Sequence, residues 1–160
     1  MKKLLDFKHA DKYFLYTGFI LLGIFSIVFA KERIINSDAA FYLFKLINFE
    51  HFNIEHGRYS AFISQLFILP FIKAGVNIDA LIVIYSLSFI VLFFLVAFFL
   101  VEVLNNYAAG FPILLLILVG VSHASYRPVS ESTQGIVYSL LLFGVLYYKT
   151  SLKISRQIIY

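Results

Sequence analysis

The chain has 160 residues, of which 61% are hydrophobic and 14% are charged. Soluble globular domains are about 45–50% apolar and about 25% charged, and a domain of this size still exposes about a third of its unfolded surface. The apolar excess therefore argues against a soluble domain and predicts an all-α integral membrane protein.

The net charge of +4 favours a membrane surface over nucleic acid as a partner, because the basic residues lie mainly near the termini and in the first loop. The absence of cysteine excludes disulfides and cysteine-based metal sites.

The first predicted element is a transmembrane helix over residues 13–30. The run is apolar apart from glycines and small polar residues, and at about 1.5 Å per residue it nearly matches a hydrocarbon layer of about 30 Å. Basic residues precede it, and Lys31-Glu32-Arg33 follows it and is expected to lie in water. Because no small-residue cleavage site stands before these charges, we expect an uncleaved signal-anchor helix.

Residues 31–78 are predicted to form a loop outside the membrane that contains two helices. Asn36-Ser37 is a helix-start signal. After it, polar residues recur every three or four positions at Asp38, Tyr42 and Lys45. Apolar residues fill the other side, namely Phe41, Leu43, Phe44 and Ile47. This pattern predicts an amphipathic helix that lies along the membrane interface.

A second helix of this loop is expected from Tyr59 to Lys73, and it has two interpretations. It is either a short fifth span or an apolar helix that lies against the bundle or dips into the membrane. Its apolar stretch from Ala61 to Lys73 is shorter than the roughly 17–25 residues that a spanning helix needs. This length favours the non-spanning interpretation.

Three further spans are predicted at residues 80–101, 107–126 and 129–148, which gives a polytopic bundle of about four transmembrane helices. Basic residues are concentrated in the first 12 and last 12 positions. The positive-inside rule therefore places both termini in the cytoplasm, in a multi-pass protein of the inner or plasma membrane. The loop 31–78 and the short loop 127–133 then share the non-cytoplasmic side. With five spans, Glu131 would lie across the bilayer from Asp38.

Two segments resemble the membrane-embedded GT-C glycosyltransferases. They are NSDAAFYLFKLINFEHFNIEHGRYSAFISQ (residues 36–65) and SHASYRPVSESTQG (residues 122–135). Members of that superfamily carry an acid in a long external loop after the first span and a second acid outside the third and fourth spans. The resemblance covers nearly the whole chain, but only as the N-terminal part of a larger family module. It implies transfer of a sugar from a polyprenyl-phosphate donor to an acceptor on the non-cytoplasmic face.

The resemblance assigns roles to several residues. Asp38, at the position of the family's loop acid, is expected to act as the catalytic base, and Glu131 to orient the acceptor. The two carboxylates are also a candidate pair for a divalent cation, Mg or Mn. Arg58 is expected to clamp the donor phosphate, helped by His56 or Arg127.

Each of these residues also has a structural alternative. Asp38 and Glu131 stand at predicted helix starts, where an acid stabilises the helix dipole. Arg58 and His56 lie at an interface where such residues anchor lipid headgroups. A competing hypothesis for the whole chain is therefore a small non-catalytic membrane subunit or scaffold. In either case membrane lipid is a partner, and further membrane helices of the same or a partner chain are expected to complete the bundle.

Overall fold

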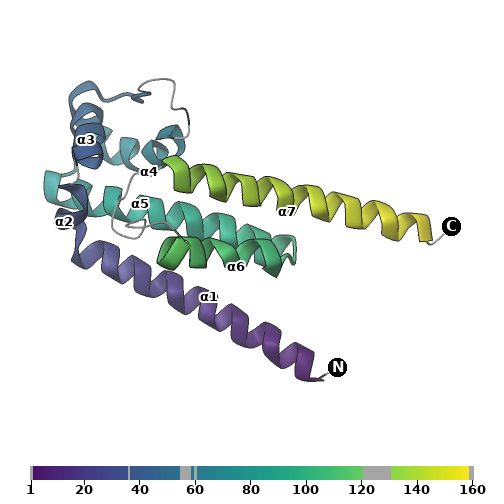
Figure 1. Ribbon diagram of the computed structural model, residues 1–160. Helices are drawn as coiled ribbons and strands as arrows, with labels where there is room; N and C mark the ends of the chain where they lie inside the picture. Colours follow the sequence, from purple (N-terminus) through teal and green to yellow (C-terminus); the bar gives the residue numbers. More distant parts are fainter. Residues whose placement is uncertain (1, 36, 55–58, 60, 121–130, 159–160) are drawn as a thin grey trace.

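The computed structural model describes residues 2–35, 37–54, 59, 61–120 and 131–158. Within these residues the secondary structure is helical and contains no strand, as the composition predicts. Four long helices form a bundle in this described part (Figure 1). They are α1 (Lys2–Val28), α5 (Ile78–Phe98) with its π-helical continuation η1 (Phe99–Val103), α6 (Tyr107–Leu115) with its π-helical continuation η2 (Leu116–Gly120), and α7 (Glu131–Ile158).

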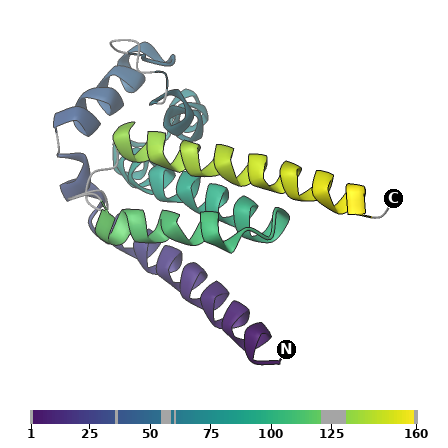
Figure 2. The same ribbon diagram turned by 45° about the vertical axis from the view of Figure 1, so that its right-hand side comes forward.

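Successive bundle helices run in opposite directions, so that both termini lie at one end, here called the terminal end (Figure 1). The opposite end is called the loop end. It is formed by the three helices between α1 and α5, namely α2 (Ala30–Ile34), α3 (Ser37–Phe49) and α4 (Ala61–Lys73). α7 begins at the loop end, and α1 and α7 diverge from one another toward the terminal end (Figures 1 and 2).

Local sequence signals set the turn between α4 and α5. Gly75 has φ +71° and lets the backbone leave α4 in the left-handed conformation. Its N–H donates to the Ile72 carbonyl at 2.9 Å, which satisfies one of the last carbonyls of the helix. The Asn77 side chain then accepts a hydrogen bond from the Ala80 N–H at 2.9 Å and caps α5. α5 therefore begins at the loop end, with α4 packed against it.

Two apolar cores hold these elements together. The bundle core joins α1, α5, α6 and α7 and includes Leu15, Phe19, Phe89, Phe93, Leu100, Ile113, Leu114 and Val137. The loop-end core joins α2, α3 and α4 to the start of α5 and includes Ile34, Ala39, Tyr42, Leu43, Leu46, Ile68, Leu69 and Tyr85. Because α5 contributes residues to both cores, the loop-end helices pack directly against the bundle.

The four long helices occur where the sequence predicts spans, but their ends differ. α1 starts at Lys2 rather than at residue 13 and ends at Val28 rather than at residue 30. α7 continues to Ile158, beyond the predicted end at Tyr148. Residues 121–126 of the third predicted span lie outside the described residues. α4 ends at Lys73, as predicted.

Within the described residues, one helix is long and apolar enough to cross a bilayer by length and composition, Ile78–Val103. Three shorter apolar helices accompany it, at Lys12–Val28, Phe62–Lys73 and Tyr107–Val119. The coarse prediction of an all-helical protein is therefore confirmed, whereas the number of spans stays a prediction.

The predicted polar face of α3 is wrong at Tyr42. This side chain is 4% exposed and belongs to the loop-end core, while Phe41 and Phe44 are exposed at 46% and 64%. The reason is that α3 packs through a stripe centred on Leu43 and Leu46, which lies one residue away from the expected one. The two phenylalanines consequently face outward, and the Lys45 ammonium lies over the Phe41 ring, 4.4 Å from its centroid.

Candidate functional site

The loop end carries the candidate acid of the sequence analysis. Asp38 lies in the first turn of α3, and its side chain is exposed. α7 begins at Glu131, also at the loop end (Figure 1). The backbone of Glu131 is described, but its side chain is not, and His56, Arg58 and Arg127 lie outside the described residues. The structure thus brings Asp38 and the start of α7 to one end of the bundle.

The predicted divalent-cation pair of Asp38 and Glu131 stays a prediction, because the Glu131 side chain lies outside the described side chains. In the part of the chain that the structure describes, no group of three or more His, Cys, Asp or Glu side chains is arranged to hold a metal ion. Of the predicted pair, only Asp38 has a described side chain, and one exposed carboxylate does not make a magnesium or manganese site.

Arg33 is the most unusual charged residue of the loop end. The sequence places it in water at the end of the first span, and this expectation is wrong, because Arg33 in α2 is fully buried at 0% exposure. Its Nη1 donates a hydrogen bond to the Ser26 hydroxyl. The Ser26 hydroxyl in turn donates to the Leu22 carbonyl at 2.8 Å. Ser86 of α5 donates to the Ser26 carbonyl, also at 2.8 Å.

The charge of Arg33 is not compensated within the described part of the chain. Its Nε and Nη2 are buried and have no hydrogen-bond partner, and no described carboxylate forms an ion pair with it. Burial lowers the pKa of the Arg33 guanidinium to about 10, because desolvation disfavours the charged form. The side chain nevertheless remains protonated at neutral pH, so a buried positive charge persists at the loop end.

Gln65 of α4 anchors the backbone that follows α3. The Asn53 N–H donates to Gln65 Oε1, and Gln65 Nε2 donates to the Asn53 carbonyl, both at 2.8 Å. The Phe52 ring packs against the Phe62 ring, with centroids 4.4 Å apart. These contacts fix both flanks of the segment that contains His56 and Arg58.

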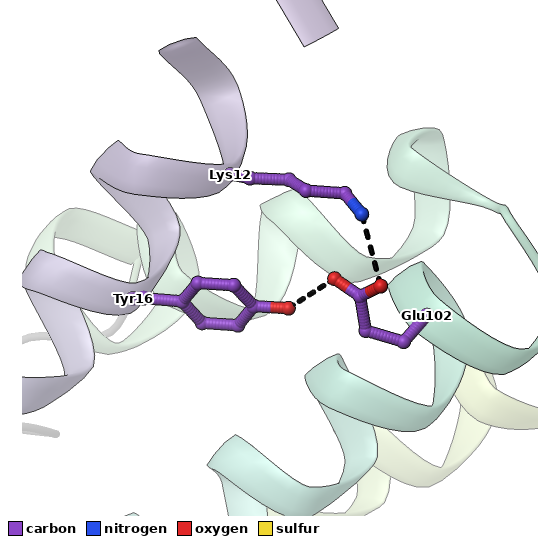
Figure 3. Close-up of polar contacts among 3 residues, drawn as sticks. All are labelled: Lys12, Tyr16 and Glu102. Carbon is purple, nitrogen blue, oxygen red and sulfur yellow. Dashed lines mark hydrogen bonds and ion pairs between the residues drawn. The ribbon is translucent and has the colours of Figure 1, made fainter. Parts of the chain in front are cut away.

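A second polar cluster lies at the terminal end (Figure 3). Lys12 and Tyr16 of α1 both donate to the carboxylate of Glu102 in η1, and the Lys12 Nζ–Glu102 Oε2 distance is 2.9 Å. The hydrogen bond to Glu102 raises the pKa of Lys12. Both ends of the ion pair are 29% exposed, so we interpret the cluster as a partly solvated clamp between α1 and η1.

An apolar groove of about 470 Å³ opens between α1 and η2. It is lined by Phe14, Thr17, Gly18, Leu21, Leu22, Phe25 and Leu118. The groove and the buried arginine are neighbours along α1, since Phe25 lines the groove and the next residue, Ser26, accepts the hydrogen bond of Arg33. The groove suits an apolar chain, because Thr17 alone among its described lining residues has a polar side chain.

Comparison of the chain with models of known protein families, with curated proteins and with solved structures found no match. The residues themselves must therefore carry any functional argument.

The sequence analysis missed Arg33 and Gln65. For Arg33 the helical spacing from Ser26 identifies no contact, because α1 ends at Val28 and α2 begins at Ala30 between them. For Gln65 no sequence signal identifies the partner, since both of its hydrogen bonds go to backbone groups of a loop.

Proposed function

We propose that the chain is a four-span membrane protein with both termini in the cytoplasm, acting as a glycosyltransferase of the GT-C kind or as the N-terminal part of one. It would transfer a sugar from a polyprenyl-phosphate donor to an acceptor hydroxyl at the non-cytoplasmic surface. The observation that carries the proposal is the position of Asp38, exposed in the first turn of α3 at the bundle end where α7 begins.

The outer surface of the bundle supports a lipid environment. Large apolar side chains are exposed along both outer helices, among them Phe14, Ile20, Leu21, Ile24 and Val28 on α1 and Leu142, Phe143 and Leu146 on α7. Soluble monomers rarely expose contiguous apolar patches larger than a few hundred Å². In a membrane, lipid and further membrane helices would cover these faces. The apolar side chains would then not be exposed to water.

The helix order of the loop end supports the catalytic role. α2, α3 and α4 follow the first long helix directly and precede the second, in the place of the external loop helices that the resemblance implies. In the proposed reaction, the acceptor oxygen attacks the anomeric carbon while the bond from that carbon to the phosphate oxygen breaks. Asp38 accepts the acceptor's proton, and the polyprenyl phosphate leaves as an anion. Arg58, His56 and Arg127 remain the proposed contacts for that phosphate.

Transfer by membrane vesicles tests this function. Vesicles that contain the complete enzyme, with the chain as its N-terminal part where it is one, are supplied with radiolabelled polyprenyl-phosphate hexoses, and transfer to endogenous acceptor is counted for wild type, Asp38→Asn and Asp79→Asn. Asp79 is the matched control, since it is another exposed acid of the loop end, in the first turn of α5. We expect Asp38→Asn to abolish transfer and Asp79→Asn to retain it.

Two results would contradict the proposal. Near-normal turnover by Asp38→Asn would remove Asp38 from the role of base. Absence of hexose transfer from any donor, both by the chain and by a complete enzyme that contains it, would favour the non-catalytic membrane subunit.

A further inference from the structure

We infer that the free edge of the Arg33 guanidinium is a buried receptor for a phosphate group, and that the phosphate is that of an isoprenyl lipid. This inference rests on the proposed function and deepens it, because it assigns a donor-phosphate anchor that the sequence analysis did not contain. The anchor at Arg33 would be separate from the phosphate contacts proposed for Arg58, His56 and Arg127.

The pattern of hydrogen bonding at Arg33 points to a ligand with two oxygens. A guanidinium is planar, and its Nε–H and one Nη2–H point in parallel from the same edge. These two nitrogens are the ones without a partner, whereas Nη1 is occupied by the Ser26 hydroxyl. The edge that binds carboxylate or phosphate in a bidentate manner is therefore buried and without a hydrogen-bond partner among the described residues.

Because Arg33 is buried and positively charged, we expect its missing partner to be an anion. An unpaired charge removed from water is costly, and buried charges in proteins are paired or bind a counter-ion. Ser26 is a neutral partner and cannot balance the charge. A phosphate bound at this edge would leave water too, and the attraction between the two charges is stronger there than at the surface.

The surroundings favour a lipid-linked phosphate over a free one. Phe25 lines the apolar groove between α1 and η2, and the next residue along α1 is Ser26, the hydrogen-bond partner of Arg33. An isoprenyl chain attached to the phosphate could extend along α1 into this groove of about 470 Å³. Because Arg33 is fully buried in this structure, binding requires the covering side chains to move, and association is expected to be slow.

The test is the melting temperature of the whole chain in a neutral detergent without phosphate. The added probes are farnesyl phosphate, farnesol and inorganic phosphate. The variants are Arg33→Met, which removes the charge, and Arg33→Lys, which keeps the charge but lacks the planar guanidinium that binds two oxygens. Lys31→Met is the matched control, because it removes an exposed basic side chain from the same short helix.

We expect farnesyl phosphate, but not farnesol, to raise the melting temperature of wild type and of Lys31→Met in a saturable way. Arg33→Met should show no rise, and Arg33→Lys should need about tenfold more probe, because a lysine cannot form the bidentate pair. Without a probe, Arg33→Met should melt at or above the wild-type temperature, since an uncompensated charge has been removed. An equal rise with inorganic phosphate would retain the anion receptor but contradict the lipid source.

The inference would be overturned if Arg33→Met kept the farnesyl phosphate response, or if Lys31→Met lost it equally. It would also be overturned if Arg33→Met without a probe melted far below wild type, because the chain itself would then supply the counter-ion. None of these readouts needs transfer activity. A chain that binds farnesyl phosphate through Arg33 and transfers no sugar would refute the proposed function alone.

Discussion

Lys12 and Glu102 are 90 positions apart in the sequence, and their side chains form an ion pair of 2.9 Å at the terminal end of the bundle (Figure 3). Tyr16, one turn after Lys12, donates to the other oxygen of the same carboxylate. The π-helical segment η1 begins three residues before Glu102. One carboxylate therefore joins the start of the apolar part of α1 to the end of the second bundle helix.

Removing the Glu102 carboxylate should weaken the contact between α1 and η1 at the terminal end. We expect Glu102→Gln to lower the melting temperature in detergent more than Tyr16→Phe, because the first change weakens two contacts and the second removes one. In a double-mutant cycle, Lys12→Met and Glu102→Gln should be less than additive, since each removes the same ion pair. Lys149→Met, an exposed lysine of α7, serves as control and should be neutral. Fully additive losses would show that the ion pair does not couple the helices.

Close helix packing gives a second prediction, at Gly110 of α6. A Cβ there would lie 2.5 Å from Val101 Cγ2 and 3.2 Å from the Ala97 carbonyl oxygen, so neither a stiff side chain nor the backbone of α5 can move aside easily. Gly110→Ala should therefore destabilise the chain by about 1–3 kcal/mol, the usual range for overpacking. Unfolding of the detergent-solubilised protein, followed by circular dichroism, measures the change.

Gly135 of α7 provides the matched control for this experiment. A Cβ at Gly135 meets nothing within 4 Å. Gly135→Ala should then be neutral or stabilising by up to about 1 kcal/mol, because alanine is the better helix former. Equal effects of Gly110→Ala and Gly135→Ala would contradict the close approach of α6 to α5.

Helix positions could be predicted from the sequence because long apolar runs and turn residues mark them. The end of α4 at Lys73 follows the prediction, whereas α5 begins at Ile78, two residues before the predicted start. The outward side of α3 could not be predicted, because Tyr42 has a polar tip and is buried by neighbours from other helices. Arg33 could not be predicted as buried either, since its burial depends on how α2 folds back onto α5, a contact between residues distant in sequence.

The anchoring of the segment after α3 gives a third prediction. Gln65→Leu removes both hydrogen bonds to the Asn53 backbone and leaves an amide and a carbonyl without their partner. We expect a loss of about 2 kcal/mol and faster hydrogen exchange at the Asn53 amide. Gln65→Glu keeps an acceptor for that amide but loses the donor to the carbonyl, so its exchange should be intermediate. Unchanged exchange in Gln65→Leu would show that the loop is held by other contacts.

Lipid contact is the fourth prediction, and it can be measured because the chain contains no tryptophan. Single tryptophans replace Ile24 in the apolar part of α1, Phe44 on α3 and Glu32 on α2, all of which are exposed. Brominated acyl chains should quench the fluorescence strongly for Ile24→Trp, partly for Phe44→Trp and weakly for Glu32→Trp. Equal quenching at Ile24 and Glu32 would contradict a transmembrane α1.

The most direct test of the account is the side of the membrane on which each end of the bundle lies. Single cysteines replace Asp38, Asn77, Asn106 and Ser155 in this cysteine-free chain, and intact cells are treated with a membrane-impermeant thiol reagent. Four spans with cytoplasmic termini predict labelling at Asp38 and Asn77, and protection at Asn106 and Ser155. Labelling at Asn106 and Ser155 with protection at Asn77 would establish five spans, and would separate Asp38 from the start of α7 by the whole bilayer.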